Sequence, residues 1–479
     1  MEQASSYAIY NGATKDLPYE TGTLTITGGT FGLDKLNHVP DKVIVTASNP
    51  GKISISGGTF YNEFDKSFCA AGCTLVAKDG VYNVVRNDQP IAKIGDTTYN
   101  SLESALANVQ NGDTITILQD VTATEILNCS KNTSLTIDLN GKKVSAADKG
   151  KNVSSVNIVG KLTIKDSSGN GVLESVSSLQ VDGEDAALTL ESGTINVTED
   201  YGIYALNGGS VVVNGGAVNS VYAALTGNNT TGNMNFTVNG GVLTADQGPA
   251  IYMPGQTNLT VTGGTLNGGI SLRMGTVKIS GGTINAVTEH IDGPENYYIS
   301  GNVWFPDALY VFGGTYTSAS GNQLDLQITG GTFNCSNGLG SAVAIYDLGK
   351  VAQTMTVAIS GNAGLYTSSS SRRAYQVLNL NDIGVTPLKP GFGMIPGNIS
   401  SRLSGGYYST DIAKAYIAND YECVKGSYPV NGKTYAYAIA KEGKLASVVA
   451  TPGKAEAGVA GTITDTIQAQ KIAGSATVT

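Results

Sequence analysis

Short segments in which apolar and polar residues alternate recur along most of the chain. A typical copy is LTVTGGTL at 259–266, where one polar residue separates two apolar residues and Gly-Gly follows. Because successive side chains of a strand point to opposite faces, Leu259 and Val261 are predicted to point inward and Thr260 outward. The Gly-Gly pair is expected to supply the positive φ that turns the corner, after which Leu266 re-enters the core.

The copies follow one another at intervals that suit a solenoid. From Gly215, the distances to the next copies are 25, 23, 18, 32 and 17 residues, and periods near twenty are typical of proteins in which each repeat forms one coil. A second strand is expected before several copies, as at 202–205 and 343–346. One copy, at 357–364, has Asn362 in place of the second glycine, and we expect Asn362 to adopt positive φ there. The pattern predicts an all-β fold, a single-stranded right-handed parallel β-helix (β-solenoid) with a short helical cap.

Three segments break this rhythm and divide the chain. Residues 101–109 place apolar residues at helical spacing behind Ser101, a suitable N-cap, so we expect a helix that covers the open end of a solenoid. Segments 56–85 and 404–439 both run from a Gly-Gly coil through a short helical stretch to a Tyr-rich strand, as matched module ends would. The predicted domains are 1–90, the C-terminal part of a first β-helix module; 91–125, a helix-strand cap; 126–440, the main β-helix module; and 441–479, a linker or the start of another element.

Composition excludes several classes of partner. The net charge is −9 with no block of Lys or Arg, which argues against a nucleic-acid partner. No run of about 18 apolar residues is present, so we expect no membrane insertion. The five cysteines define no disulfide framework and are interpreted as small buried side chains. Cys69 and Cys73, four residues apart, are the one spacing that also suits a redox or metal pair, although no second Cys or His pair accompanies them.

Residues 95–122, followed by the Gly-Gly coils, resemble the β-helical modules of large surface proteins of gut Gram-positive bacteria, within the pectate-lyase-like superfamily. The resemblance covers nearly the whole chain and implies an extracellular or cell-surface setting, with adhesion or glycan binding as the function and no catalytic motif. The expected partners are glycans or host or bacterial surface proteins, and the expected state is a monomer. Since no secretory signal opens the sequence, we expect a fragment whose leader lies upstream. A phage fibre or tailspike, which needs no leader and would be a trimer, is the competing hypothesis.

Acidic residues after successive corners form the basis of an enzymatic alternative, a polysaccharide lyase or a glycoside hydrolase on the same scaffold. Glu199, Asp200 and Asp246 could hold Ca²⁺, with Glu289 in the same series, and Arg273 could abstract a proton. Their distances from the corner glycines differ, which favours a solvated surface over a catalytic site. We therefore expect no cofactor other than this calcium ion.

The longest interruption between corners, 287–308, is the predicted ligand-binding loop. Aromatic faces stack on sugar rings and carboxylates accept hydrogen bonds from sugar hydroxyls, and long loops on rigid scaffolds often carry function. The alternative is that the loop folds its aromatic side chains onto the coil beneath it as a satellite core. The candidate residues are Tyr297, Tyr298, Trp304, Asp292, Glu295 and Asp307.

Overall fold

The computed structural model divides the chain into two compact units, Met1–Ser104 and Ala105–Thr479, each considered by itself below. The division falls inside the predicted cap, 91–125. The residues that the structure describes are 7–11, 24–32, 42–46, 53–70, 72–78, 80–86, 89–148, 150, 153–227, 233–287, 305–312, 323–347, 354–379, 398–443, 445–451 and 466–471.

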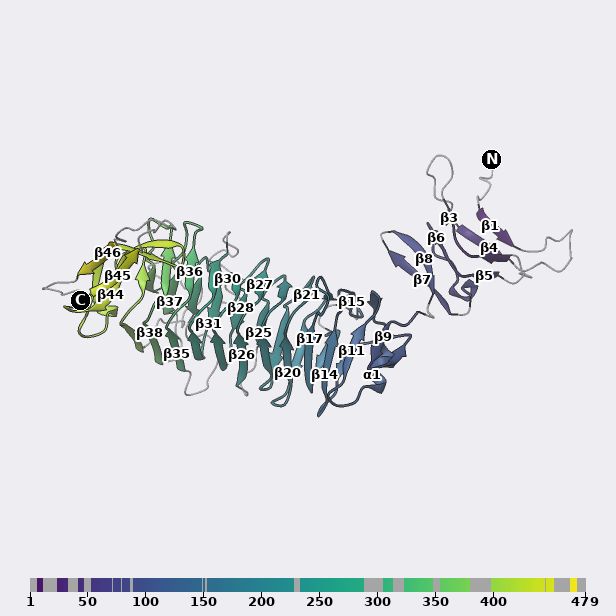
Figure 1. The fold of residues 1–479 in the computed structure, drawn as a ribbon, viewed down its shortest axis with the longest axis horizontal. Helices are drawn as coiled ribbons and strands as arrows, with labels where there is room; N and C mark the ends of the chain where they lie inside the picture. The colour runs from purple at the N-terminus through teal and green to yellow at the C-terminus, as the bar shows by residue number, and fades with distance from the viewer. Residues whose placement is uncertain are drawn as a thin grey trace, which may run out of the picture. The chain divides into compact units, whose positions relative to one another are not determined.

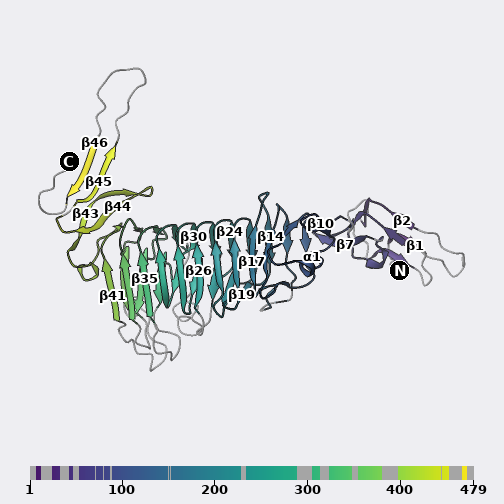
Figure 2. The same ribbon diagram turned by 60° about the horizontal axis from the view of Figure 1, so that its bottom comes forward.

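Three parallel β-sheets make up most of the unit Ala105–Thr479 (Figures 1 and 2). Each coil contributes one strand to each sheet in turn, and each strand pairs in parallel with the equivalent strand of the next coil. Among the described residues, ten coils have all three strands, and an eleventh contributes to the first two sheets. The prediction of a parallel β-helix is therefore confirmed.

The strands of the three sheets alternate along the chain. The first sheet contains β11 (Thr114–Ile117), β14 (Ser134–Asp138), β17 (Lys161–Lys165), β20 (Ala187–Leu190), β23 (Ser210–Val213), β26 (Met234–Val238), β29 (Thr257–Val261), β32 (Gly275–Ile279), β35 (Gln323–Ile328), β38 (Thr354–Ile359) and β41 (Asn398–Leu403). The second contains β12 (Val121–Thr122), β15 (Lys143–Ser145), β18 (Val172–Ser175), β21 (Thr194–Val197), β24 (Ala217–Ser220), β27 (Val242–Ala245), β30 (Thr265–Gly268), β33 (Thr283–Ala286), β36 (Thr332–Cys335), β39 (Gly364–Thr367) and β42 (Tyr407–Tyr408). The third contains β13 (Leu127–Cys129), β16 (Val156–Ile158), β19 (Leu179–Asp182), β22 (Ile203–Leu206), β25 (Leu225–Gly227), β28 (Ile251–Met253), β31 (Ile270–Leu272), β34 (Leu309–Phe312), β37 (Val343–Asp347) and β40 (Tyr375–Asn379).

The core lies inside the coils and consists of stacked apolar side chains. Leu259, Val261 and Leu266 are at most 1% exposed, as the alternation predicts. The register pairs Leu266 with Ile284 of the next coil, which is also fully buried. Burying one such side chain contributes about 1.5–3 kcal/mol, and the ladder repeats from coil to coil, so the core is continuous along the unit.

The two glycines of each corner meet two different physical requirements. The second has positive φ, 79° at Gly241 and 87° at Gly282. The first does not, but a Cβ on Gly240 would lie 2.5 Å from the carbonyl oxygen of Asn214 in the preceding coil. Neighbouring strands lie about 4.8 Å apart, and only a residue without a side chain lets the corners stack this closely. The expectation that Gly-Gly supplies positive φ therefore holds for the second glycine alone.

The corner that contains Asn362 differs from the prediction. Asn362 does not adopt positive φ; the preceding Gly361 does, at 63°. The strand register leaves four residues in this corner, 360–363, where the preceding corner has three, 329–331. The additional residue shifts the left-handed conformation to Gly361, so the prediction for Asn362 was wrong.

The predicted helix is present as α1 (Leu102–Asn108). Its Ser101 hydroxyl accepts a hydrogen bond from the backbone N–H of Ser104 at 3.0 Å, as an N-cap does, and Leu102 and Ala105 are fully buried. A hairpin of β9 (Ala92–Ile94) and β10 (Thr97–Tyr99) precedes the helix. The role of this segment as a cap stays a prediction.

Within the smaller unit, the described part of residues 7–86 repeats the corner pattern and ends in a hairpin. Strands β1 and β4, β2 and β5, and β3 and β6 pair in parallel, and β8 pairs antiparallel with both β6 and β7. The elements are β1 (Tyr7–Asn11), β2 (Leu24–Ile26), β3 (Thr30–Phe31), β4 (Lys42–Thr46), β5 (Ile53–Ile55), β6 (Gly58–Phe60), the 3₁₀ helix η1 (Lys66–Phe68), β7 (Cys73–Lys78) and β8 (Val81–Arg86).

The end of the larger unit has the same construction. Strand β42 is followed by the 3₁₀ helix η4 (Lys414–Tyr416) and the hairpin β43 (Tyr421–Val430) and β44 (Lys433–Lys441), and β44 pairs antiparallel with β42. The predicted likeness of segments 56–85 and 404–439 is therefore confirmed. Beyond it, β45 (Leu445–Thr451) and β46 (Thr466–Lys471) form an antiparallel pair within 441–479.

Candidate functional site

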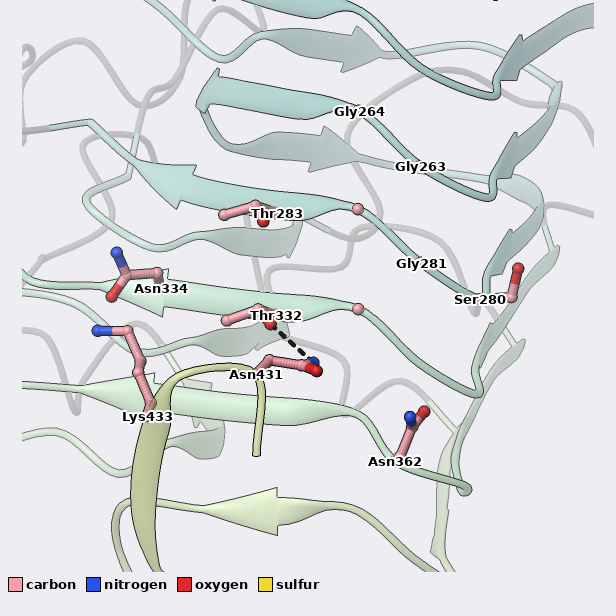
Figure 3. A pocket seen from close by; sticks show the side chains of 12 residues that line it. Gly263, Gly264, Ser280, Gly281, Thr283, Thr332, Asn334, Asn362, Asn431 and Lys433 are labelled. Carbon is pink, nitrogen blue, oxygen red and sulfur yellow. Dashed lines mark hydrogen bonds between the residues drawn. The ribbon is translucent and has the colours of Figure 1, made fainter. Parts of the chain in front are cut away.

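The hairpin β43–β44 folds back over the outer face of the second sheet. It turns at Asn431 and Gly432, whose φ values of 50° and 77° are those of the tight turns that connect hairpin strands. The Asn431 side-chain amide donates a hydrogen bond to the hydroxyl of Thr332 at 3.2 Å, as the dashed line in Figure 3 shows. The hairpin tip is thus fixed to β36, two strands beyond β42 in the sheet.

Tyrosines hold the hairpin against the sheet. Tyr428 and Tyr435 of the hairpin are buried and pack with Tyr366 of β39 and Tyr407 of β42, and the rings of Tyr407 and Tyr428 lie 5.8 Å apart. A Cβ on Gly364 would overlap the Tyr435 hydroxyl, so the glycine makes room for this ring. Burial raises the pKa of Tyr435 to about 12, and the ring therefore stays neutral at physiological pH.

Lys433 brings a positive charge to the tip of the hairpin. Its Nζ lies 4.0 Å from the centroid of the Tyr366 ring, a distance at which the electron-rich ring face attracts an ammonium group. The side chain is partly exposed. The ammonium is therefore held in place by the aromatic ring while it keeps contact with solvent.

Between this hairpin tip and the corners of the β-helix lies an open groove of about 470 Å³ (Figure 3). Its floor consists of Gly-Gly corners from successive coils, where the backbone is not covered by side chains. Its walls carry hydroxyl and amide groups, and among the described residues that line it Lys433 is the one charged residue. The lining residues are Gly263, Gly264, Ser280, Gly281, Gly282, Thr283, Gly331, Thr332, Asn334, Asn362, Asn431 and Lys433.

A ladder of amides orients one wall of the groove. The Asn334 amide donates to Asn285 Oδ1 at 3.2 Å, and the Asn285 amide donates to Asn267 Oδ1 at 2.9 Å. These residues face each other in the register of β30, β33 and β36. Because Asn285 holds its side chain, Asn334 presents its amide to the groove in a fixed direction.

Of the six candidate residues in the predicted ligand-binding loop, the structure describes one, Asp307. Asp307 is fully buried; its Oδ1 accepts a hydrogen bond from the backbone N–H of Ser341, and its Oδ2 accepts one from the Tyr346 hydroxyl, both at 2.6 Å. It therefore joins two coils inside the protein, and its full burial keeps it away from a ligand in solution. Tyr297, Tyr298, Trp304, Asp292 and Glu295, together with Glu289, lie outside the described residues.

Burial changes the acidity of Asp307. Loss of water raises the pKa of its carboxyl to about 6, even though the hydrogen bonds from Ser341 and Tyr346 and the charge of Arg372 act in the opposite direction. The Phe305 ring stacks on Tyr346 at 3.8 Å between centroids and closes the site. This arrangement is a buried structural network.

The predicted calcium ligands do not form one site. Glu199 and Asp200 lie on the coil of β21 and β22, whereas Asp246 follows β27, two coils away. Two strand spacings separate their backbones by about 9.5 Å. Across the part of the chain that the structure describes, no group of three or more His, Cys, Asp or Glu side chains is placed to hold a metal ion.

The predicted calcium ligands and the predicted base, Arg273, each have different surroundings. Asp200 Oδ2 accepts a hydrogen bond from the Ser178 hydroxyl at 2.7 Å, and its Oδ1 accepts one from the backbone N–H of Tyr201 at 2.8 Å, so it supports the turn. Asp246 is exposed. Arg273 is 2% exposed and lies 6.0 Å from the centroid of the Tyr252 ring, so it does not face solvent as a lyase base must.

The sequence did not predict the groove, although one difference between two like segments pointed to a longer hairpin. Segments 56–85 and 404–439 are alike, but the second has a longer stretch between its 3₁₀ helix and its last strand, with Asn431-Gly432 at the turn. A comparison of the two would have predicted a longer hairpin. Where its tip lies could not follow from the sequence.

Comparison of the chain with protein-family models, with curated proteins and with solved structures finds no match. None of the described helices is long and apolar enough to cross a membrane.

Proposed function

We propose that the chain is a β-helix module of an extracellular or cell-surface protein that acts by binding, and that the groove beneath the β43–β44 hairpin receives its ligand, a glycan. The volume and the lining of the groove are the observations that support the proposal. Its volume of about 470 Å³ lies within the range of about 300–1,000 Å³ that is usual for ligand sites. Its lining combines fixed amides, hydroxyls and uncovered backbone with a single ammonium.

This lining suits sugar hydroxyls. Each hydroxyl both donates and accepts hydrogen bonds, and the Asn and Thr side chains of the walls do the same. The glycine floor allows a flat ring to approach the backbone closely. Since the groove is open, a longer chain of sugars can continue past the part that is bound.

The same lining supports binding over catalysis at this place. Glycoside hydrolysis requires two carboxyl groups on either side of the scissile bond. The lining residues that the structure describes include no Asp, Glu or His. The resemblance of residues 95–122 to surface-protein modules supports the extracellular setting.

A glycan array with the purified chain, with and without calcium, tests the proposal. We expect binding to one polysaccharide class that does not depend on calcium. Lys433→Ala should weaken it about tenfold or more, since a hydrogen bond to a charged group contributes about 1.5–3 kcal/mol, and Asn334→Ala should weaken it about two- to tenfold, since a hydrogen bond between neutral groups contributes about 0.5–1.5 kcal/mol. Lys425→Ala is the matched control, because Lys425 is an exposed lysine of the same hairpin that does not line the groove.

Two results would contradict the proposal. A blank array would favour adhesion to a protein partner, and equal affinities of Lys433→Ala and Lys425→Ala would place the ligand elsewhere. The mass in solution distinguishes glycan binding and protein adhesion from a phage fibre. We expect the mass of a monomer, whereas a phage fibre would be a trimer.

A further inference from the structure

Cys69 and Cys73 lie beside two consecutive residues of the smaller unit. Cys69 forms a parallel bridge with Ile55, and the Cys73 thiol donates a weak hydrogen bond to the carbonyl oxygen of Ser56 at 3.8 Å. Between the two cysteines the chain turns back, with the Cys73 N–H bonded to the carbonyl oxygen of Ala70 at 2.9 Å. The turn therefore brings the two cysteines to the same short stretch of backbone.

The electrostatic surroundings of the two thiols point to the same proximity. Burial raises the pKa of the Cys69 thiol, and the nearby Cys73 raises it further because two thiolates would repel each other. Both side chains are partly exposed. The pair is thus within reach of a small reagent in solution.

The matched module end shows that the fold does not require these thiols. There the bridge joins Leu403 to Ile417, and the N–H of Tyr421 bonds to the carbonyl oxygen of Ala418 at 3.2 Å, so the same turn is formed. Ile417 and Tyr421 occupy the places of Cys69 and Cys73. The turn of segment 404–439 thus forms without cysteines. The two cysteines of segment 56–85 add thiol chemistry to a turn that does not need them.

We propose that Cys69 and Cys73 are a reversible redox pair that closes to a disulfide when the protein meets a low-molecular-weight disulfide such as oxidised glutathione. The thiolate of one cysteine attacks a sulfur of the reagent, giving a mixed disulfide and releasing one reduced thiol. The second cysteine then attacks the protein sulfur of the mixed disulfide and releases the other thiol. The two cysteines are oxidised, one reagent disulfide is reduced to two thiols, and the protons lost by the cysteines are taken up by the released thiolates.

The small size of the closed ring limits the effect on stability. Disulfides stabilise mainly by restricting the unfolded chain, and they do so less for short loops. Partly exposed pairs are also the ones that are readily reduced again. The disulfide therefore acts on the local turn that leads into β7, and the global unfolding temperature is expected to change by a few degrees at most.

Thiol counting and peptide mapping of the full chain test the proposal. The reduced, denatured protein is expected to show five free thiols, and the protein treated with oxidised glutathione while folded is expected to show three. Trypsin cleaves after Lys66 and Lys78, so peptide 67–78 contains both cysteines and no other. In the oxidised sample this peptide is expected to lose two hydrogens and to regain them on treatment with dithiothreitol.

The single variants Cys69→Ser and Cys73→Ser are expected to stop at the mixed disulfide, with glutathione attached to the remaining cysteine of peptide 67–78. The double variant Cys69→Ile/Cys73→Tyr, which installs the residues of the matched end, is expected to fold with an unchanged circular dichroism spectrum and no redox response. The proposal is overturned if the oxidised protein keeps five thiols, if the disulfide joins other cysteines, or if glutathione stays attached to the parent chain.

Discussion

The side-chain amide of Asn431 donates a hydrogen bond to the hydroxyl of Thr332 at 3.2 Å, although 99 residues separate them in the chain. The contact exists because the β43–β44 hairpin is long enough to pass over β39. Strands β43 and β44 have 10 and 9 residues, whereas their counterparts β7 and β8 have 6 each. Segments 56–85 and 404–439 are thus built alike, and the longer hairpin of the second forms the groove.

Gly364→Ala is expected to loosen this hairpin. The added Cβ would overlap the Tyr435 hydroxyl, and such overpacking costs about 1–3 kcal/mol. Urea denaturation measures the loss, and faster tryptic cleavage after Lys425 locates it in the hairpin. Combining the change with Tyr435→Phe should restore part of the stability, since the overlapping oxygen is removed. An unchanged midpoint for Gly364→Ala would mean that Tyr435 does not pack there.

Gly240→Ala is expected to destabilise the β-helix by about 2 kcal/mol or more, because its Cβ would meet the carbonyl oxygen of Asn214. Gly28→Ala is the matched control: it is also the first glycine of a corner, it has no positive φ, and its Cβ would meet nothing within 4 Å. Thermal unfolding of both variants makes the comparison. If both substitutions lowered the unfolding temperature equally, the close approach of the coils would not be the reason for the first glycine.

Asp307 should make the stability of the protein depend on pH. Folding raises its pKa from 3.8 to about 6, so the folded state holds the proton more tightly than the unfolded chain. The resulting stabilisation is fully present below pH 3.8 and is lost as the pH rises through about 6; it amounts to about 3 kcal/mol. The unfolding free energy of the parent chain minus that of Asp307→Asn should therefore fall by about 2.4 kcal/mol between pH 4 and pH 7. A difference that stays constant over this range would contradict the assignment.

Asp200→Ala is expected to cost about 1–3 kcal/mol, because the Ser178 hydroxyl and the backbone N–H of Tyr201 lose their acceptor. Asp246→Ala, at an exposed position, should change the unfolding free energy by less than about 0.5 kcal/mol. Calcium should not shift the unfolding temperature of either variant or of the parent chain. Stabilisation by calcium that disappears in Asp200→Ala would instead support a metal ligand.

The alternation of apolar and polar residues was sufficient to predict the coils. Leu259 and Val261 are buried and the Gly-Gly corners are where the sequence puts them, because the period of two along a strand is a local property of the chain. Ser101 likewise caps its helix as predicted. The reason for the first glycine was not accessible, since it depends on the carbonyl of another coil.

The candidate site shows the limit of the same reasoning. Asp200 and Asp246 follow similar corners, and only the strand pairing shows that they lie two coils apart. Asp307 stands in a loop rich in aromatic and acidic residues, yet its burial against Ser341 and Tyr346 makes it structural. The spacing of residues along the sequence does not show which residues of another coil a side chain contacts.

The sequence by itself determined the parallel β-helix, its corners, its helix and the likeness of segments 56–85 and 404–439, because each follows from local periodicity and turn chemistry. Only the tertiary structure decided that the groove lies under β43–β44 and that Lys433 is held there by Tyr366. The physical reason is that stacking fixes neighbours across coils. The position of the hairpin tip depends on its tyrosines and on Gly364, residues whose contacts are remote in the chain.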